Sequence, residues 1–154
     1  MGTTVLQAVG VVLAGILAGE ELIVRYGVQP ALGNLDDRIH VATRIALVRA
    51  LRIVVPGLIL PTAAVAVAIL VTGGGGQNGA GWRWAGMAAL LVFVLFSFLG
   101  TVPINMKVVD WQPDQLPPDW RAVVHRWQRL DTLRSTAAIL AFVCFVIALA
   151  ARIP

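Results

Sequence analysis

The sequence predicts an all-α fold: an integral membrane four-helix bundle with an amphipathic interfacial helix between its first and second spans. Hydrophobic residues make up 58% of the 154-residue chain and charged residues only 13%, whereas a soluble domain carries about 25% charged residues. The apolar residues also gather in long runs, and the ionisable residues lie mainly between them. A lipid bilayer accommodates such a chain because apolar side chains can face outward. The length suggests a single domain, residues 1–154.

The predicted spans cover residues of about 3–26, 53–72, 84–104 and 132–151. Each is close to the roughly 20 residues that cross a hydrocarbon core of about 30 Å. Continuous runs of this length satisfy their backbone in lipid as helices. The first run has no preceding Lys or Arg, and acidic residues follow it in place of a processing site. We therefore interpret it as a retained membrane helix and not as a signal peptide.

The polar connections between these spans have different characters. They are residues 27–52 and 103–131, together with a glycine-rich flexible turn over residues 73–81. Residues 34–52 predict an amphipathic helix at the interface, because apolar and basic side chains alternate there at roughly helical spacing. The members of this pattern are Ile39, Ala42, Ile45 and Ala46, with Arg38, Arg44 and Arg52.

Prolines in residues 103–118 predict an ordered irregular loop. Asp119 follows two of them and is a suitable start for the last helix. That helix continues to about residue 152, which gives a length of roughly 50 Å at 1.5 Å per residue. It is therefore longer than the hydrocarbon core, and its first turns should project from the membrane or line a pocket at its surface.

Basic residues predict the topology. Only Arg83 and Arg152 lie on the side of the termini, and the other ten Lys and Arg lie near the polar connections. The positive-inside rule then places both termini outside a cell membrane and the polar connections in the cytoplasm. The excess charge of +4 is small and flanks apolar runs, so we expect no nucleic-acid partner. A single cysteine, Cys144, excludes a disulfide framework within the chain.

Two adjacent acids, Glu20 and Glu21, interrupt the first span. An ionised carboxylate at the centre of a span costs about 2.5–3.5 kcal/mol, and less near its end. Adjacent helical residues point about 100° apart, so only one of the two can face a given pocket well. We expect one of them to point inward to a cation, either Arg129 or Arg134, as a catalytic group or as a structural salt bridge.

The start of the last helix is the segment richest in reactive side chains. One helix face carries Trp120, Trp127, Asp131 and Arg134, which suits either a flat ligand with polar edges or an aromatic belt at the membrane interface. His125 lies on a neighbouring face and is a candidate general base. Together with Glu20 and Asp131 it is also a candidate metal ligand, although no close metal-binding spacing is present.

The third connection and the last helix resemble the anthrone oxygenase family of small membrane proteins. The resemblance rests on Val102-Pro103-Ile104-Asn105, on a Trp-Gln-Pro segment at Trp111, on Pro117-Pro118-Asp119-Trp120, and on Arg126-Trp127 followed by Arg134. It covers residues 100–154 well and the first span more loosely. It implies a four-span bundle, in which some members oxidise anthrones to anthraquinones in aromatic polyketide pathways and many have no known activity.

The resemblance implies roles for Asn105, Trp120, Trp127 and Arg134. Family members often carry a histidine where this chain has Asp131. The chain would then use Asp131 or His125 in its place, or catalyse a different reaction.

The resulting hypothesis is a membrane oxidoreductase, an anthrone-oxygenase-like monooxygenase acting on a flat aromatic substrate. Glu20, His125, Asp131, Arg129 and Arg134 are its candidate catalytic residues. Asn105, Trp111, Trp120 and Trp127 are its candidate substrate-binding residues. O2 would be the co-substrate, either without a bound cofactor or with a transition metal.

The alternative is a non-catalytic membrane subunit that binds a ligand or assembles a complex. A transporter is a weaker fit because the charges cluster at one end. The sequence requires no oligomer.

Overall fold

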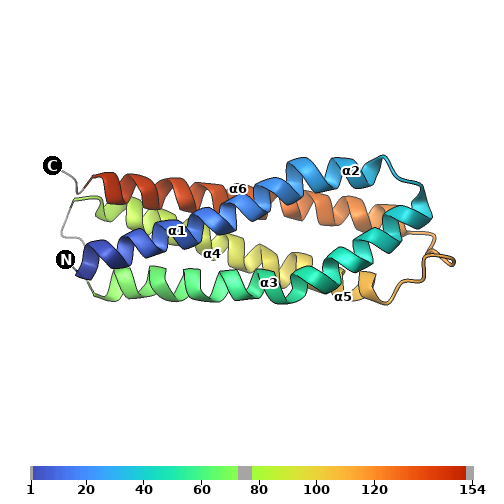
Figure 1. The fold of residues 1–154 in the computed structure, drawn as a ribbon, viewed down its shortest axis with the longest axis horizontal. Helices are drawn as coiled ribbons and strands as arrows, with labels where there is room; N and C mark the ends of the chain where they lie inside the picture. Colours follow the sequence, from blue (N-terminus) through green and yellow to red (C-terminus); the bar gives the residue numbers. More distant parts are fainter. Residues whose placement is uncertain (1, 73–77, 152–154) are drawn as a thin grey trace.

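The computed structural model describes residues 2–72 and 78–151. Within these residues, four helical stretches are long and apolar enough to cross a membrane: Gly2–Gly33, Asp37–Val71, Ala80–Val109 and Trp120–Ala150. They run alternately up and down, so the start of the first stretch and the end of the last lie at the same end of the bundle (Figure 1). The predicted four-helix membrane bundle is confirmed. Most of the predicted glycine-rich turn, and Arg152, lie outside the described residues.

The stretches are subdivided by short π-helical turns. The first consists of α1 (Gly2–Ile23), the π-helical turn η1 (Val24–Val28) and α2 (Gln29–Gly33); the second is α3 (Asp37–Val71). The third consists of α4 (Ala80–Leu95), the π-helical turn η2 (Phe96–Thr101) and α5 (Val102–Val109); the last is α6 (Trp120–Ala150). Asp119 is the residue that precedes α6, as the sequence predicted.

A proline explains why the helix widens at η1 and again at η2. Pro30 follows η1 and Pro103 follows η2, each in the first turn of the next helix. Proline has no N–H, and its ring crowds the carbonyl four residues earlier, so the preceding turn cannot close as an ordinary α-helical turn. The prediction of an irregular loop from residue 103 is therefore wrong as far as residue 109, because the helix widens and continues. Residues 110–119 are non-helical, as predicted.

The predicted interfacial helix is the first half of α3, which runs into the second span without a break. Its buried face carries His40, Val41, Arg44 and Ile45, while Ile39 is exposed. The buried face of this half of α3 therefore carries polar as well as apolar side chains. In a membrane protein an apolar side chain can face lipid, which leaves the inner face free for polar groups.

A buried polar layer separates apolar cores at the two ends of the bundle. One core includes Leu17, Leu90 and Phe93; the other, at the charged end, includes Val41 and Val108. Between them along the helices lie buried polar side chains: Glu21 in α1, Ser97 and Thr101 in η2, and Asp131, Arg134 and Ser135 in α6. α6 packs against α4 and α1, and α3 packs mainly against α1.

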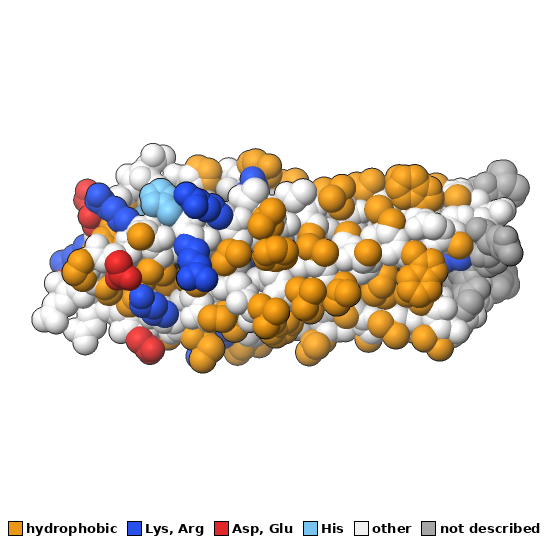
Figure 2. Space-filling model, turned by 180° about the vertical axis from the view of Figure 1, so that it is seen from behind, with side chains coloured by type: hydrophobic (Ala, Val, Ile, Leu, Met, Phe, Trp, Pro, Cys, Tyr) orange, Lys and Arg blue, Asp and Glu red, His pale blue; other side chains and the backbone are white. Residues whose placement is uncertain are grey.

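The outer surface has the character of a membrane protein. Large apolar side chains cover much of the face that Figure 2 shows, and charged side chains gather at one end of it. Exposed ion pairs tie the loop of residues 110–119 and the starts of α3 and α6 together. They are Arg38–Asp114 (2.7 Å), Lys107–Asp119 (3.3 Å) and Arg121–Asp37 (2.7 Å). Each exposed pair contributes little to stability, about 0–1 kcal/mol, so the apolar cores dominate the packing.

Candidate active site

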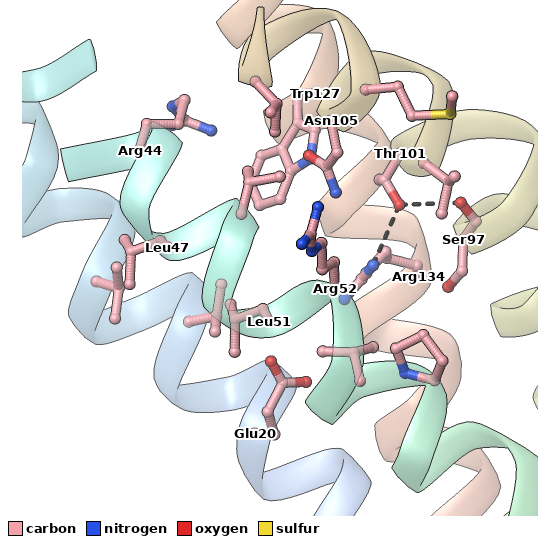
Figure 3. Close-up of a pocket in the computed structure, with 18 of the residues that line it drawn as sticks. Glu20, Arg44, Leu47, Leu51, Arg52, Ser97, Thr101, Asn105, Trp127 and Arg134 are labelled. Carbon is pink, nitrogen blue, oxygen red and sulfur yellow. Dashed lines mark hydrogen bonds between the residues drawn. The ribbon is translucent and has the colours of Figure 1, made fainter. Parts of the chain in front are cut away.

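A cavity of about 840 Å³ lies between α3 and the helices that face it, α1, η1, α2, η2, α5 and α6 (Figure 3). Its volume is within the range of small-molecule pockets, about 300–1,000 Å³. Most of the lining residues are apolar, and the polar ones are few and placed on different helices. It extends from Glu20, beside the buried polar layer, to Asp110 at the end of α5. This arrangement suits an apolar ligand that carries a small number of polar groups.

The polar layer beside the cavity is organised by Arg134. Its Nε and Nη2 donate to the two carboxylate oxygens of Glu21, with 3.0 Å from Nε to Oε2. Its Nη1 donates to the Thr101 hydroxyl at 3.1 Å, which in turn donates to the carbonyl of Ser97 at 3.1 Å. Glu21 is 0% exposed and Arg134 6%. A bidentate pair of this kind, in which the third guanidinium nitrogen is also hydrogen-bonded, is the arrangement that lets a buried ion pair persist.

Asp131 lies next to this pair and is also buried. Its Oδ1 is 3.5 Å from Arg134 Nε and accepts no hydrogen bond from any described residue. One helical turn further on, Ser135 donates to the backbone carbonyl of Asp131 at 2.6 Å and accepts from Arg25 at 3.2 Å. Asp131 therefore belongs to the polar layer and not to the cavity lining.

Glu20 faces the cavity, in contrast to its neighbour Glu21. It lines the cavity wall and is half-buried. Among the described residues, its buried Oε2 has no hydrogen-bond partner. The sequence predicted that one of the two acids would contact Arg129 or Arg134. In the structure, Glu21 forms the ion pair, and its partner is Arg134. Arg129 is exposed. A carboxylate oxygen that is buried beside a cavity and unpartnered is available to accept a proton from a ligand.

Arg44 and Trp127 form the wall at the charged end of the cavity. Arg44 donates to Gln29 Oε1 at 2.7 Å and to His40 Nε2 at 3.4 Å. Its guanidinium carbon is 5.0 Å from the centre of the Trp127 ring, within the range of a cation–π interaction. The His40 ring meets Trp120 edge-on at 5.4 Å between centroids. Arg44 is thus fixed in place, which orients the Trp127 ring beside it.

The structure brings only part of the predicted site together. Glu20, Asn105, Trp127 and Arg134 line the cavity, and Asp131 lies in the adjacent polar layer. The other predicted residues lie elsewhere: Trp111 is buried in the apolar core at the charged end, Trp120 packs on His40 and Arg121, and His125 and Arg129 are exposed on α6. His125 and Arg129 lie on the exposed face of α6, which the helix turns away from the cavity.

The candidate metal ligands are not assembled into a site. His125 is exposed, whereas Glu20 and Asp131 lie at the cavity wall and in the polar layer. Within the described part of the chain, no group of three or more His, Cys, Asp or Glu side chains is close enough to hold a metal ion.

Several cavity and polar-layer residues were not among the predicted site residues. Ser97 and Thr101 sit four residues apart in an apolar span, and this spacing on one helix face was an available signal. Arg44 and Arg52 were predicted only as members of an amphipathic interfacial helix, yet both line the cavity. Sequence periodicity predicts which residues share a helix face but not what that face contacts, so their place in the cavity wall required the structure.

The fold and the site define a multi-pass membrane protein with a largely apolar cavity beside a buried polar layer. Residues 46–144 match the family model described as anthrone oxygenase. That match spans more than half of the chain, and the chain therefore belongs to the anthrone oxygenase family. The matched residues include Arg52 of the cavity wall as well as η2, α5 and most of α6, whereas Glu20 and Arg44 precede them. Comparisons with curated proteins and with solved structures gave no match.

Proposed function

We propose that this protein is a membrane-embedded oxygenase that oxidises a flat, lipid-soluble aromatic substrate of the anthrone type within the cavity. The observation that carries the proposal is Glu20, a carboxylate with a buried and unpartnered oxygen at the wall of a largely apolar cavity. Membership of the anthrone oxygenase family supports an oxygenase role. Exposed apolar residues at the cavity wall, Ile23, Phe98 and Met106, support entry of the substrate from the bilayer.

Glu20 is the proposed general base. It removes a proton from the methylene carbon of the anthrone, and the resulting carbanion is stabilised by delocalisation onto the ring oxygen. The carbanion passes one electron to O2, and the two radicals combine to form a carbon–oxygen bond. The proton on Glu20 then passes to the distal oxygen of this peroxide.

The second half of the reaction completes the balance. Glu20 removes the remaining proton of the former methylene carbon, the oxygen–oxygen bond breaks and a ketone forms. The departing hydroxide takes this proton from Glu20 and leaves as water. One methylene and one O2 thus give one carbonyl and one water, and Glu20 is regenerated. The route needs no bound electron carrier because the substrate itself reduces O2.

The test is turnover by the Glu20→Gln variant. We expect purified protein in lipid nanodiscs to consume O2 and form anthraquinone from anthrone, and Glu20→Gln to lose at least about 100-fold in kcat, in the range of a lost general base. Asp114→Asn makes the same carboxylate-to-amide change in an exposed loop residue and should retain full activity. A Glu20→Gln variant that is folded and fully active would remove Glu20 from the mechanism.

The second candidate function is ligand binding without turnover. The cavity volume and its apolar lining favour this role as directly as they favour catalysis. Binding of the aromatic compound, with no O2 consumption by the wild-type protein, would establish it.

A further inference from the structure

The arginines of the cavity wall differ in whether their guanidinium groups already have hydrogen-bond or ion-pair partners within the protein. Of the residues that the structure describes, Arg44, Arg52 and Arg134 line the cavity. Arg134 is neutralised by its bidentate pair with Glu21. Arg44 is fixed by the side-chain oxygen of Gln29 at 2.7 Å. Neither of these guanidinium groups can turn to a ligand without breaking contacts that hold helices together.

Arg52 is different. It lies at the cavity rim on α3 and makes no hydrogen bond or ion pair with any residue in the described ranges. In Figure 3 its side chain reaches from α3 toward the side of the cavity that carries Asn105. A guanidinium presents five N–H donors and stays charged. Arg52 is therefore a cation in the cavity wall whose charge and hydrogen bonds are available.

Neighbouring donors of the cavity wall are available as well. The Trp127 indole Nε1 is buried, and no acceptor for it is found in the described part of the chain. Asn105 lines the cavity and has no hydrogen bond to a described residue. More than about 90% of buried polar groups in proteins have a partner, so the unpartnered indole N–H at the cavity wall is a donor available to an acceptor in the cavity.

We propose that Arg52, with the Trp127 indole N–H and the Asn105 amide, forms an oxyanion subsite that selects planar aromatic ligands bearing a ring ketone or phenol oxygen. The inference rests on the proposed function in taking the cavity as the substrate pocket, and it names the ligand chemistry of that pocket. When Glu20 removes a proton from carbon, the negative charge moves onto the ring oxygen. A pre-positioned cation and neutral donors stabilise that charge where it develops.

Together with Glu20, this subsite would fix the orientation of a ligand in the cavity. Glu20 contributes a proton acceptor near the polar layer, and Arg52 contributes a donor for oxygen at the rim. A ligand that carries oxygen on one side and an acidic C–H on another satisfies both. An aromatic hydrocarbon of the same outline satisfies neither, and it leaves the donors unpaired, which disfavours its binding.

The experiment compares two probes of the same three-ring outline, a hydroxyanthraquinone and anthracene, with the full-length protein in nanodiscs. Binding is measured by quenching of tryptophan fluorescence, with empty nanodiscs as the blank for partitioning into lipid. We expect Arg52→Gln to weaken hydroxyanthraquinone binding by about tenfold or more, as for the loss of a charged hydrogen bond. Anthracene binding should stay within about twofold, and Arg52→Lys should restore part of the loss.

Arg49→Gln is the matched control, because Arg49 is an exposed arginine on the same helix that does not line the cavity. It should leave both probes unaffected. An Arg52→Gln variant that binds hydroxyanthraquinone like the wild type, or loses both probes equally, would overturn the subsite and leave Arg52 as an anchor for lipid headgroups.

Binding and turnover separate the two proposals. Probe selectivity that depends on Arg52, without any anthrone oxidation, would support the subsite and reject the oxygenase. Anthrone oxidation with unchanged selectivity in Arg52→Gln would support the oxygenase and reject the subsite.

Discussion

Adjacent carboxylates with different surroundings set the chemistry of this protein at the residue scale. Glu20 lines the cavity with one oxygen unpartnered by any described residue, while Glu21 is fully buried against Arg134. The rotation of about 100° between neighbouring helical residues separates the two roles. Glu20 is thus available to a ligand in the cavity, whereas Glu21 is held in a structural ion pair.

The buried ion pair between Glu21 and Arg134 predicts that replacing Glu21 lowers the stability of the fold strongly. Glu21→Gln removes the charge that balances Arg134 and leaves a buried guanidinium without an equal partner. We expect the free energy of unfolding to fall by about 3–5 kcal/mol, the range for breaking a buried ion pair. Denaturant unfolding in detergent, followed by circular dichroism, measures this change.

Removing all three neighbouring buried charges is the control for that prediction. Asp131 lies 3.5 Å from Arg134 Nε and would otherwise lose its cation. A Glu21→Leu, Asp131→Asn, Arg134→Met variant should therefore recover most of the loss, because uncharged residues of similar volume can replace buried charges. Glu20→Gln should cost about 1 kcal/mol or less, since that side chain is not part of the pair. Equal losses for Glu20→Gln and Glu21→Gln would contradict the division between the two acids.

The sequence could predict one inward acid with either Arg129 or Arg134 as its partner, because a carboxylate within a span must find a cation. It could not choose between Glu20 and Glu21, since the rotation of α1 about its axis depends on packing against α6 and α3. It also could not separate Trp127, which lines the cavity, from Trp120, which packs on His40. Both tryptophans fit one helix face, and the difference depends on which part of α3 lies opposite each of them.

At the scale of the elements, glycines set how closely the helices approach. A Cβ on Gly86 would lie 2.6 Å from Phe145 Cε1 in α6, and one on Gly15 would lie 3.0 Å from Phe142. Gly19, four residues after Gly15 in the sequence, faces open space. Of these two glycines of α1, only Gly15 thus lies close to a side chain of another helix. The closest approach among the three is at Gly86, between α4 and α6.

Gly86→Ala should therefore destabilise the bundle. The added methyl meets the aromatic ring of Phe145 and the Cβ of Cys144, at 3.2 Å, so α4 or the ring must shift. Overpacking of this kind costs about 1–3 kcal/mol, which exceeds the gain of about 0.5–1 kcal/mol from replacing glycine in a helix. Thermal unfolding of the detergent-solubilised variant measures the net effect.

Gly19→Ala is the matched comparison in α1. It makes the same substitution where nothing lies within 4 Å, so it should leave the melting temperature unchanged or raise it slightly. A Gly86→Ala variant as stable as Gly19→Ala would show that the contact between α4 and α6 adapts without loss.

The whole molecule combines a lipid-facing surface, a charged end and a cavity between them. Long apolar runs made the bundle predictable, because composition and length alone require a membrane. The cavity was not predictable from the runs. It depends on how α3 is separated from the helices that face it, which is a property of tertiary packing.

Topology decides which side of the membrane the charged end of the cavity faces, and it gives the last prediction. The excess of basic residues at that end predicts that it is cytoplasmic.

The test starts from a variant in which Cys144, the single cysteine, is replaced by alanine. One new cysteine is then placed at Asn78 and, in a second variant, at Asp114. Asn78 is exposed at the end of the bundle that holds the termini, and Asp114 is exposed in the loop at the charged end. A membrane-impermeant maleimide should label Asn78→Cys in intact cells and Asp114→Cys only after permeabilisation. The reverse pattern would place the charged end outside the cell, so that polar products leaving the cavity at that end would be released to the exterior.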